Sequence, residues 1–121
     1  MQHVVTLSWL LLAAVHAPPA AVLFAPGLTE RLYGVAPDGT PGMLIVHRGA
    51  LFLAVVAAAL FAAFVPEGRR TASLVVGISM VAFLAIDAAA GLPQGPLRTI
   101  AAADAIALPP LVLVTWAAWI R

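Results

Sequence analysis

Four long apolar stretches, at about residues 4–25, 43–65, 71–90 and 100–120, occupy most of the chain. Each is close to the roughly 20 residues that a helix needs to cross the hydrocarbon core of a bilayer. Hydrophobic residues make up 64% and charged residues 9% of the sequence, which leaves too few polar side chains to cover a water-soluble globule. The sequence therefore predicts an all-α, polytopic membrane protein, with one transmembrane domain over residues 1–121 that is an antiparallel four-helix bundle.

Prolines predict where these helices bend. Pro18-Pro19 interrupts the first stretch and Pro109-Pro110 the fourth, so we expect kinked helices. Turn signals fill residues 26–42, but Leu28 to Tyr33 predicts a short interfacial helix with Tyr33 at headgroup level. The loop from Pro66 to Arg70 is tight, which makes the second and third helices antiparallel neighbours.

A rival interpretation makes the first stretch a signal peptide with cleavage after Ala17. Its first residues contain no Lys or Arg, and a proline would directly follow the cut. We therefore favour a spanning helix.

His47-Arg48-Gly49 places two ionisable side chains about one turn inside the second predicted span. An arginine in a spanning segment costs at least about 2.5–3.5 kcal/mol on insertion scales, so it needs partners or water. Counted at 1.5 Å per residue, Asp87 and Asp104 lie at a similar depth. The sequence predicts that these charges form one intramembrane layer, which Arg98, His47 or a shared proton balances.

Two interpretations of this layer stay open. In one, Arg48 and the aspartates are an ion-paired clasp that sets helix register, because buried charges must be paired whatever their purpose. In the other, the layer binds a headgroup, an anion, a proton or a small solute. In the second interpretation the candidate ligand-binding residues are His47, Arg48, Asp87, Asp104, Arg98, Tyr33 and His16.

His16 and His47 also form a pair on adjacent helices, an arrangement that holds haem b in membrane bundles. Their predicted depths differ by roughly 6–9 Å, so we expect no cofactor and expect His16 to hydrogen-bond locally near Pro18-Pro19. No two acids or histidines have helical i, i+3 or i, i+4 spacing, so no metal site is predicted. There is no hydrolase, phosphate-loop or zinc signature, and the six arginines are too scattered for a nucleic-acid surface.

Arginine bias predicts the orientation. Arg69, Arg70 and Arg121 fall on the side of the N-terminus, and Arg31 and Arg98 fall on the other side. Because positive charge stays inside, both termini are expected in the cytoplasm of a bacterial cell, with the protein in the inner membrane.

Four short segments carry a resemblance: Leu32-Tyr33-Gly34, His47 to Phe52, Ser79 to Phe83, and Ala103-Asp104. They resemble a group of small bacterial four-helix membrane proteins without established function. Members of that group often carry the label phosphopantetheine adenylyltransferase, which we reject for this chain. The soluble enzyme of that name resembles a nucleotide-binding α/β fold with a histidine-containing transfer motif, and this chain has neither. The resemblance implies four spans and no substrate.

We therefore expect a membrane protein that binds or passes a small polar or amphipathic ligand at the charge layer. Arg48 would hold an anionic group, while the aspartates would orient it and take up or release protons. Four short helices enclose little volume, so transport would need a homo-oligomer. The alternatives are a structural or accessory subunit of a larger membrane complex and, third, an intramembrane enzyme with acid–base chemistry at Asp87 or Asp104.

Overall fold

The computed structural model describes residues 1–120, and over this range it is helical without any strand; Arg121 and its part in the arginine bias lie outside the described residues. The elements are α1 (Gln2–Ala21), α2 (Leu28–Tyr33), α3 (Gly39–Phe64), the 3-10 turn η1 (Pro66–Gly68), α4 (Arg69–Ala89), α5 (Pro96–Ile106) and α6 (Leu108–Trp119). Three segments, α1, α3 and η1 with α4, are long and apolar enough to cross a membrane. The bent pair of α5 and α6 makes a fourth if it is taken as one span. The all-helical class is as the sequence predicts, and the long apolar helices are compatible with a membrane protein.

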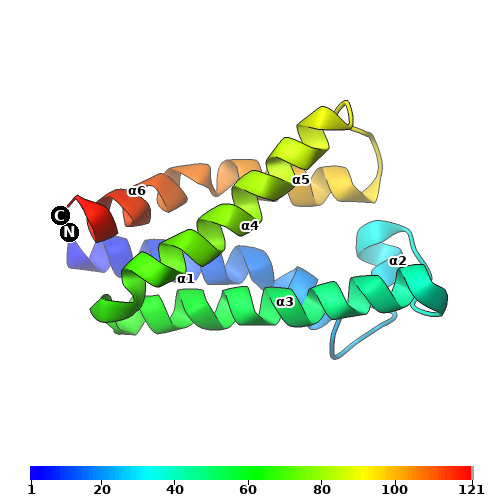
Figure 1. The fold of residues 1–121 in the computed structure, drawn as a ribbon, viewed down its shortest axis with the longest axis horizontal. Coiled ribbons are helices and arrows are strands. Elements are labelled where there is room, and N and C mark those ends of the chain that lie inside the picture. The colour runs from blue at the N-terminus through cyan, green and yellow to red at the C-terminus, as the bar shows by residue number, and fades with distance from the viewer. Residues whose placement is uncertain (121) are drawn as a thin grey trace.

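The helices run along the long axis of the molecule (Figure 1). α1 and α3 make the most extensive contact, and α6 packs on both α1 and α4. α4 begins beside α3 at η1 and diverges from it toward its own C-terminal end (Figure 1). Both ends of the drawn chain lie beside η1, and α2 lies at the opposite end (Figure 1). The molecule therefore has a closed end with the termini and a wider end with α2 and α5.

The apolar core fills the end of the molecule that holds the termini. Its fully buried side chains come from α1, α3, α4 and α6, and include Trp9, Leu12, Ala59, Val76 and Val114. Buried alanines on α3 belong to the same cluster as the large Trp9 side chain of α1, and small residues of this kind let helices pack closely within lipid. The polar residues singled out in the sequence lie beyond this core, toward the wider end.

Two arginines after η1 hold the closed end together. Arg69 donates hydrogen bonds from Nε to the Ala62 carbonyl (3.0 Å) and from Nη1 to the Gln2 side chain (3.0 Å). Arg70 donates from Nε to the Ala118 carbonyl (3.0 Å). Carbonyls in the last turn of a helix have no partner inside that helix, so these contacts cap the C-terminal ends of α3 and α6.

The two proline pairs stand at different positions in their helices. Pro18 and Pro19 lie inside α1 near its C-terminal end, where their missing N–H groups leave the carbonyls four residues earlier without helical donors, and α1 stops at Ala21. In the fourth apolar stretch the chain bends by 42° between α5 and α6, and Pro109 and Pro110 stand in the first turn of α6. First-turn N–H groups have no helical partner in any case, so the bend precedes the prolines.

Gly49 lets α1 and α3 approach at the wider end. A Cβ atom at this position would lie 2.9 Å from the Leu23 backbone nitrogen and 3.4 Å from the Pro19 carbonyl oxygen. A side chain there would push the end of α1 away from α3. Gly49 therefore brings α1 close to the turn of α3 that carries Arg48.

Candidate functional site

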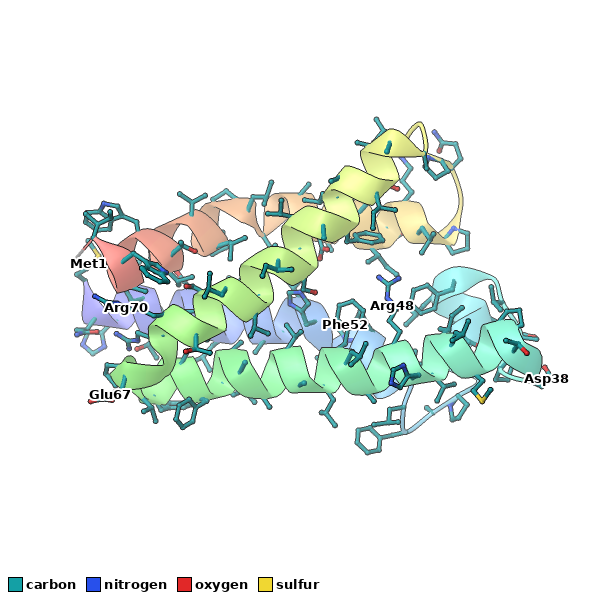
Figure 2. All side chains as sticks on the ribbon, in the orientation of Figure 1. Met1, Asp38, Arg48, Phe52, Glu67 and Arg70 are labelled. Carbon is teal, nitrogen blue, oxygen red and sulfur yellow. The ribbon has the colours of Figure 1, made fainter. Side chains whose placement is uncertain are left out.

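Arg48 lies about 13–14 Å from the start of α3 and extends into the space between α3 and the α4–α5 end of the molecule (Figure 2). Its side chain is half-buried, whereas the neighbouring His47 is exposed and Gly49 is buried. Successive residues of a helix point about 100° apart, so His47 faces away from Arg48. The structure thus separates the two ionisable residues that the sequence motif places together.

Three aromatic rings surround the Arg48 guanidinium, and we call them the aromatic cage. The Arg48 Cζ atom lies 5.5 Å from the centre of the Tyr33 ring, 5.0 Å from that of Phe52 and 5.2 Å from that of Phe83. The rings come from α2, α3 and α4. A cation–π contact is worth about 0.5–1 kcal/mol when exposed and about 2 kcal/mol when desolvated, so the cage offsets part of the cost of the buried charge.

The predicted ion pairs of Arg48 do not form as direct contacts. Within residues 1–120, no carboxylate oxygen lies within 4.0 Å of its guanidinium, and the guanidinium donates no hydrogen bond to a protein atom. Aromatic rings accept only weak hydrogen bonds, so the N–H groups of Arg48 keep their capacity to bind an acceptor.

Asp104 and His16 lie next to this cluster. Asp104 on α5 is 6% exposed, and its carboxylate interacts through space with both Arg48 and His16. The His16 ring on α1 stacks in a tilted arrangement on Phe52, with 5.8 Å between the ring centres. The cage and these two residues bring α1 to α5 together at one point.

The protonation of His16 follows from its hydrogen bond. Its Nδ1 lies 2.7 Å from the Leu12 carbonyl oxygen, which can only accept, so Nδ1 carries a proton. This is the local hydrogen bond that the sequence predicts for His16. The other ring nitrogen, Nε2, is buried and has no hydrogen-bond partner among residues 1–120.

Tyr33 supplies a neutral hydroxyl to the cluster. Burial raises the pKa of its phenol above the usual 10.0, while Arg48 lowers it and Asp104 raises it. The net direction is upward, so Tyr33 stays protonated at neutral pH and is a hydrogen-bond donor at the rim of the cage.

A cavity of about 270 Å³ lies beside Arg48, between α3 and α4. Phe52, Phe83 and Ser79 line its wall, and Leu51 and Ile86 line its mouth. Leu51 is 57% and Ile86 is 68% exposed, so the mouth lies on the outer surface of the helices, which faces lipid in a membrane. We call this space the α3–α4 cavity.

Asp87 does not line the α3–α4 cavity. It lines a second cavity, of about 210 Å³, together with Arg98, Leu92 and Pro93, between α4 and the start of α5. Asp87 is 9% exposed, and Arg98 is exposed. The predicted single layer is therefore divided between two cavities. Asp87 lies one turn beyond Phe83 on the same face of α4, which diverges from α3 toward that end (Figure 1), and depth counted along separate helices does not show this divergence.

Sequence reasoning gave no role to Phe52, Phe83 or Ser79. Phe52 follows Arg48 by four residues, a spacing that puts both on one face of α3 and could have identified it. Phe83 and Ser79 reach the cavity from α4, and their contact depends on the crossing of two helices. No signal in the sequence points to that contact.

The two candidate haem ligands lie in different environments, because His16 is buried and His47 is exposed. Within the described residues, no group of three or more His, Asp or Glu side chains is arranged to hold a metal ion. Comparison of the chain with protein-family models, with curated proteins and with solved structures finds no match. The function must therefore be inferred from the site itself.

Proposed function

We propose that the protein binds an anionic amphipathic molecule from the lipid phase, with the anionic group on Arg48 and the apolar part in the α3–α4 cavity. One observation carries this proposal. The Arg48 guanidinium is held by three aromatic rings beside a lipid-facing cavity, with no carboxylate of residues 1–120 in contact.

The chemistry of the guanidinium favours an anion with two or more oxygens. Its N–H groups form a planar fork that matches carboxylate, phosphate or sulfonate oxygens in pairs. Such charge-assisted hydrogen bonds are about twice as strong as neutral ones and would satisfy donors that the aromatic cage leaves unpaired. The nearby Tyr33 hydroxyl adds a further donor.

The cavity favours a ligand that also has an apolar part. Its wall is almost entirely hydrophobic, with Ser79 and Arg48 as polar exceptions. A volume of about 270 Å³ is near the lower end of the roughly 300–1,000 Å³ that ligand pockets span. We infer that the headgroup and the adjoining part of a chain occupy the cavity, while the rest of the chain stays in the bilayer.

The proposed setting is an antiparallel bundle of four spans in a bacterial inner membrane with both termini in the cytoplasm. Arg69 and Arg70 lie at the end of the molecule that holds the termini, which supports this orientation under the positive-inside rule. A homo-oligomer would be required if the ligand is passed across the membrane, because one chain encloses little volume. We propose a binding protein and assign no enzymatic step.

The structural-subunit alternative keeps one supporting observation. Asp104 attracts Arg48 through space, so the pair could stabilise the packing of α5 on the bundle without any ligand. In that case Arg48→Ala would lower stability, and Asp104→Asn would partly restore it, since breaking one side of a buried pair costs about 3–5 kcal/mol.

Native mass spectrometry of the protein in phosphatidylcholine nanodiscs tests the proposal. Decanesulfonate is the anionic probe, and decyltrimethylammonium is the cation of equal chain length. We expect decanesulfonate to be retained by the wild type and lost by Arg48→Ala, with helicity unchanged. Arg31→Ala removes the same charge from an exposed position on α2 and is the control, expected to bind normally. Equal retention by Arg48→Ala and wild type would refute the anion site.

A further inference from the structure

We propose that a groove between α4 and α6 binds an acyl chain of an anionic phospholipid, with the phosphate of that lipid on Arg70. Arg70 lies at the end of the molecule that holds the termini, well apart from Arg48 (Figure 2). This second site is therefore independent of the proposed function. Its ligand is a lipid of the surrounding bilayer whose headgroup has a net negative charge.

The groove is a hollow of about 750 Å³ between α4 and α6. Ser73, Gly77, Val81 and Ala85 line its α4 side at intervals of four residues, a spacing that places them along one face of the helix. A Cβ atom at Gly77 would meet nothing within 4 Å, so this glycine leaves the middle of the groove open. Val112 on the α6 side is 65% exposed. The groove is therefore elongated and opens on the outer surface of the helices.

The length of the groove is close to the depth of one bilayer leaflet. Between Ser73 and Ala85, α4 rises by about 18 Å. Half of a hydrocarbon core is about 15 Å deep, and α4 is inclined to the long axis of the molecule (Figure 1), which shortens its depth in the membrane. An acyl chain that enters beside Ser73 therefore matches the groove over its length.

Arg70 stands at the Ser73 end of the groove. Its Cζ atom lies 5.4 Å from the centre of the Trp119 ring, and Trp119 Nε1 donates a 2.9 Å hydrogen bond to Ser73 Oγ. Ser73 Oγ in turn donates a 2.7 Å hydrogen bond to the Arg70 carbonyl oxygen. Tryptophan rings gather at the level of lipid headgroups, so this contact places the guanidinium near the phosphates of the same leaflet.

The Arg70 guanidinium keeps donors for a phosphate. Its Nε donates to the Ala118 carbonyl, but within residues 1–120 its two Nη groups have no protein partner and no carboxylate lies within 4.0 Å. Guanidinium N–H groups bind phosphate oxygens in pairs. A zwitterionic headgroup would also bring its own ammonium toward Arg70. Charge complementarity therefore favours a lipid with a net negative headgroup.

Fluorescence quenching by brominated lipids reports on this groove. Trp116 lines it and Trp119 lies at its end, each 47% exposed, whereas Trp9 is buried in the core. The full chain is reconstituted in vesicles of equimolar phosphatidylglycerol and phosphatidylcholine, with bromine on the acyl chains of only one of the two lipids. Exchanging the brominated lipid keeps the charge of the vesicle constant. We expect phosphatidylglycerol to bind about fivefold more strongly than phosphatidylcholine, the preference that one arginine gives for an anionic lipid. Equal quenching by the two lipids would overturn the proposal.

Two variants separate the headgroup contact from the groove. Arg70→Gln should abolish the preference for phosphatidylglycerol, while Arg31→Gln, which removes a charge from an exposed position on α2, should keep it. Because Arg70 also caps α6, Gly77→Leu is the second variant and leaves Arg70 in place. Its side chain would fill the open middle of the groove and should abolish the preference with helicity unchanged.

Two further outcomes would contradict the proposal. A preference that persists in Gly77→Leu would mean that Arg70 attracts anionic lipids at the surface without the groove. Quenching by neither lipid would mean that a second copy of the chain covers the groove.

Discussion

Replacing Gly49 with alanine should separate α1 from α3 and displace Arg48 from its aromatic cage. The new Cβ would lie 2.9 Å from the Leu23 backbone nitrogen, where ordinary contacts begin at 3.4 Å, so one helix must move by about 0.5 Å. Overpacking of this kind costs about 1–3 kcal/mol. Alanine recovers about 0.5–1 kcal/mol through its better helix propensity. The net destabilisation is therefore about 0.5–2 kcal/mol.

Gly77→Ala is the control variant, because it gives the same gain in helix propensity without the close contact at Gly49. Gly77 lies inside α4, and a Cβ there would meet nothing within 4 Å. Gly49→Ala and Gly77→Ala then gain the same helix propensity. Their free energies of unfolding should differ only by the cost of overpacking at residue 49, about 1–3 kcal/mol. Unfolding by sodium dodecyl sulfate in mixed dodecylmaltoside micelles, followed by far-ultraviolet circular dichroism, gives the two midpoints. Equal midpoints would refute the role assigned to the close approach at Gly49.

Three further predictions concern the closed end and one loop. Arg69→Ala should lower the free energy of unfolding by about 1–2 kcal/mol, because the end of α3 loses its cap. In the same detergent titration, Gln2→Ala should lower the free energy of unfolding by less than half as much. Trp119→Phe should cost about 0.5–1.5 kcal/mol by removing its 2.9 Å hydrogen bond to Ser73, and Ser73→Ala should cost more, because it also removes the 2.7 Å hydrogen bond to the Arg70 carbonyl; the double variant should cost less than their sum in a double-mutant cycle. Leu92 has a φ of 54°, so Leu92→Asn should raise the midpoint of unfolding slightly, and a lowered midpoint would contradict this strain.

Much of the fold could be predicted from local patterns. Four apolar stretches, the short helix over Leu28–Tyr33 and the break near Pro109-Pro110 all appear in the structure. Each depends on residues close together in the chain, such as hydropathy over about 20 residues or a missing N–H group. The local hydrogen bond of His16 belongs to the same class, since its acceptor is four residues away.

The partners of Arg48 could not be predicted in this way. Depth along each helix placed Asp87 and Asp104 equally near Arg48, but depth does not show how far apart the helices lie at that level. In the structure the charges of Asp104 and Arg48 are close enough to interact, whereas Asp87 lines a cavity with Arg98. It also turns His47 outward, although this residue is adjacent to Arg48 in the chain.

The sequence by itself determined that the protein forms helices long and apolar enough to cross a membrane and that one arginine lies within such a helix, because both follow from composition over single helices. Only the tertiary structure decided that, among residues 1–120, aromatic rings and not carboxylates contact this arginine. That choice depends on how α2, α3 and α4 cross and rotate, and small residues such as Gly49 set those crossings through contacts between distant parts of the chain.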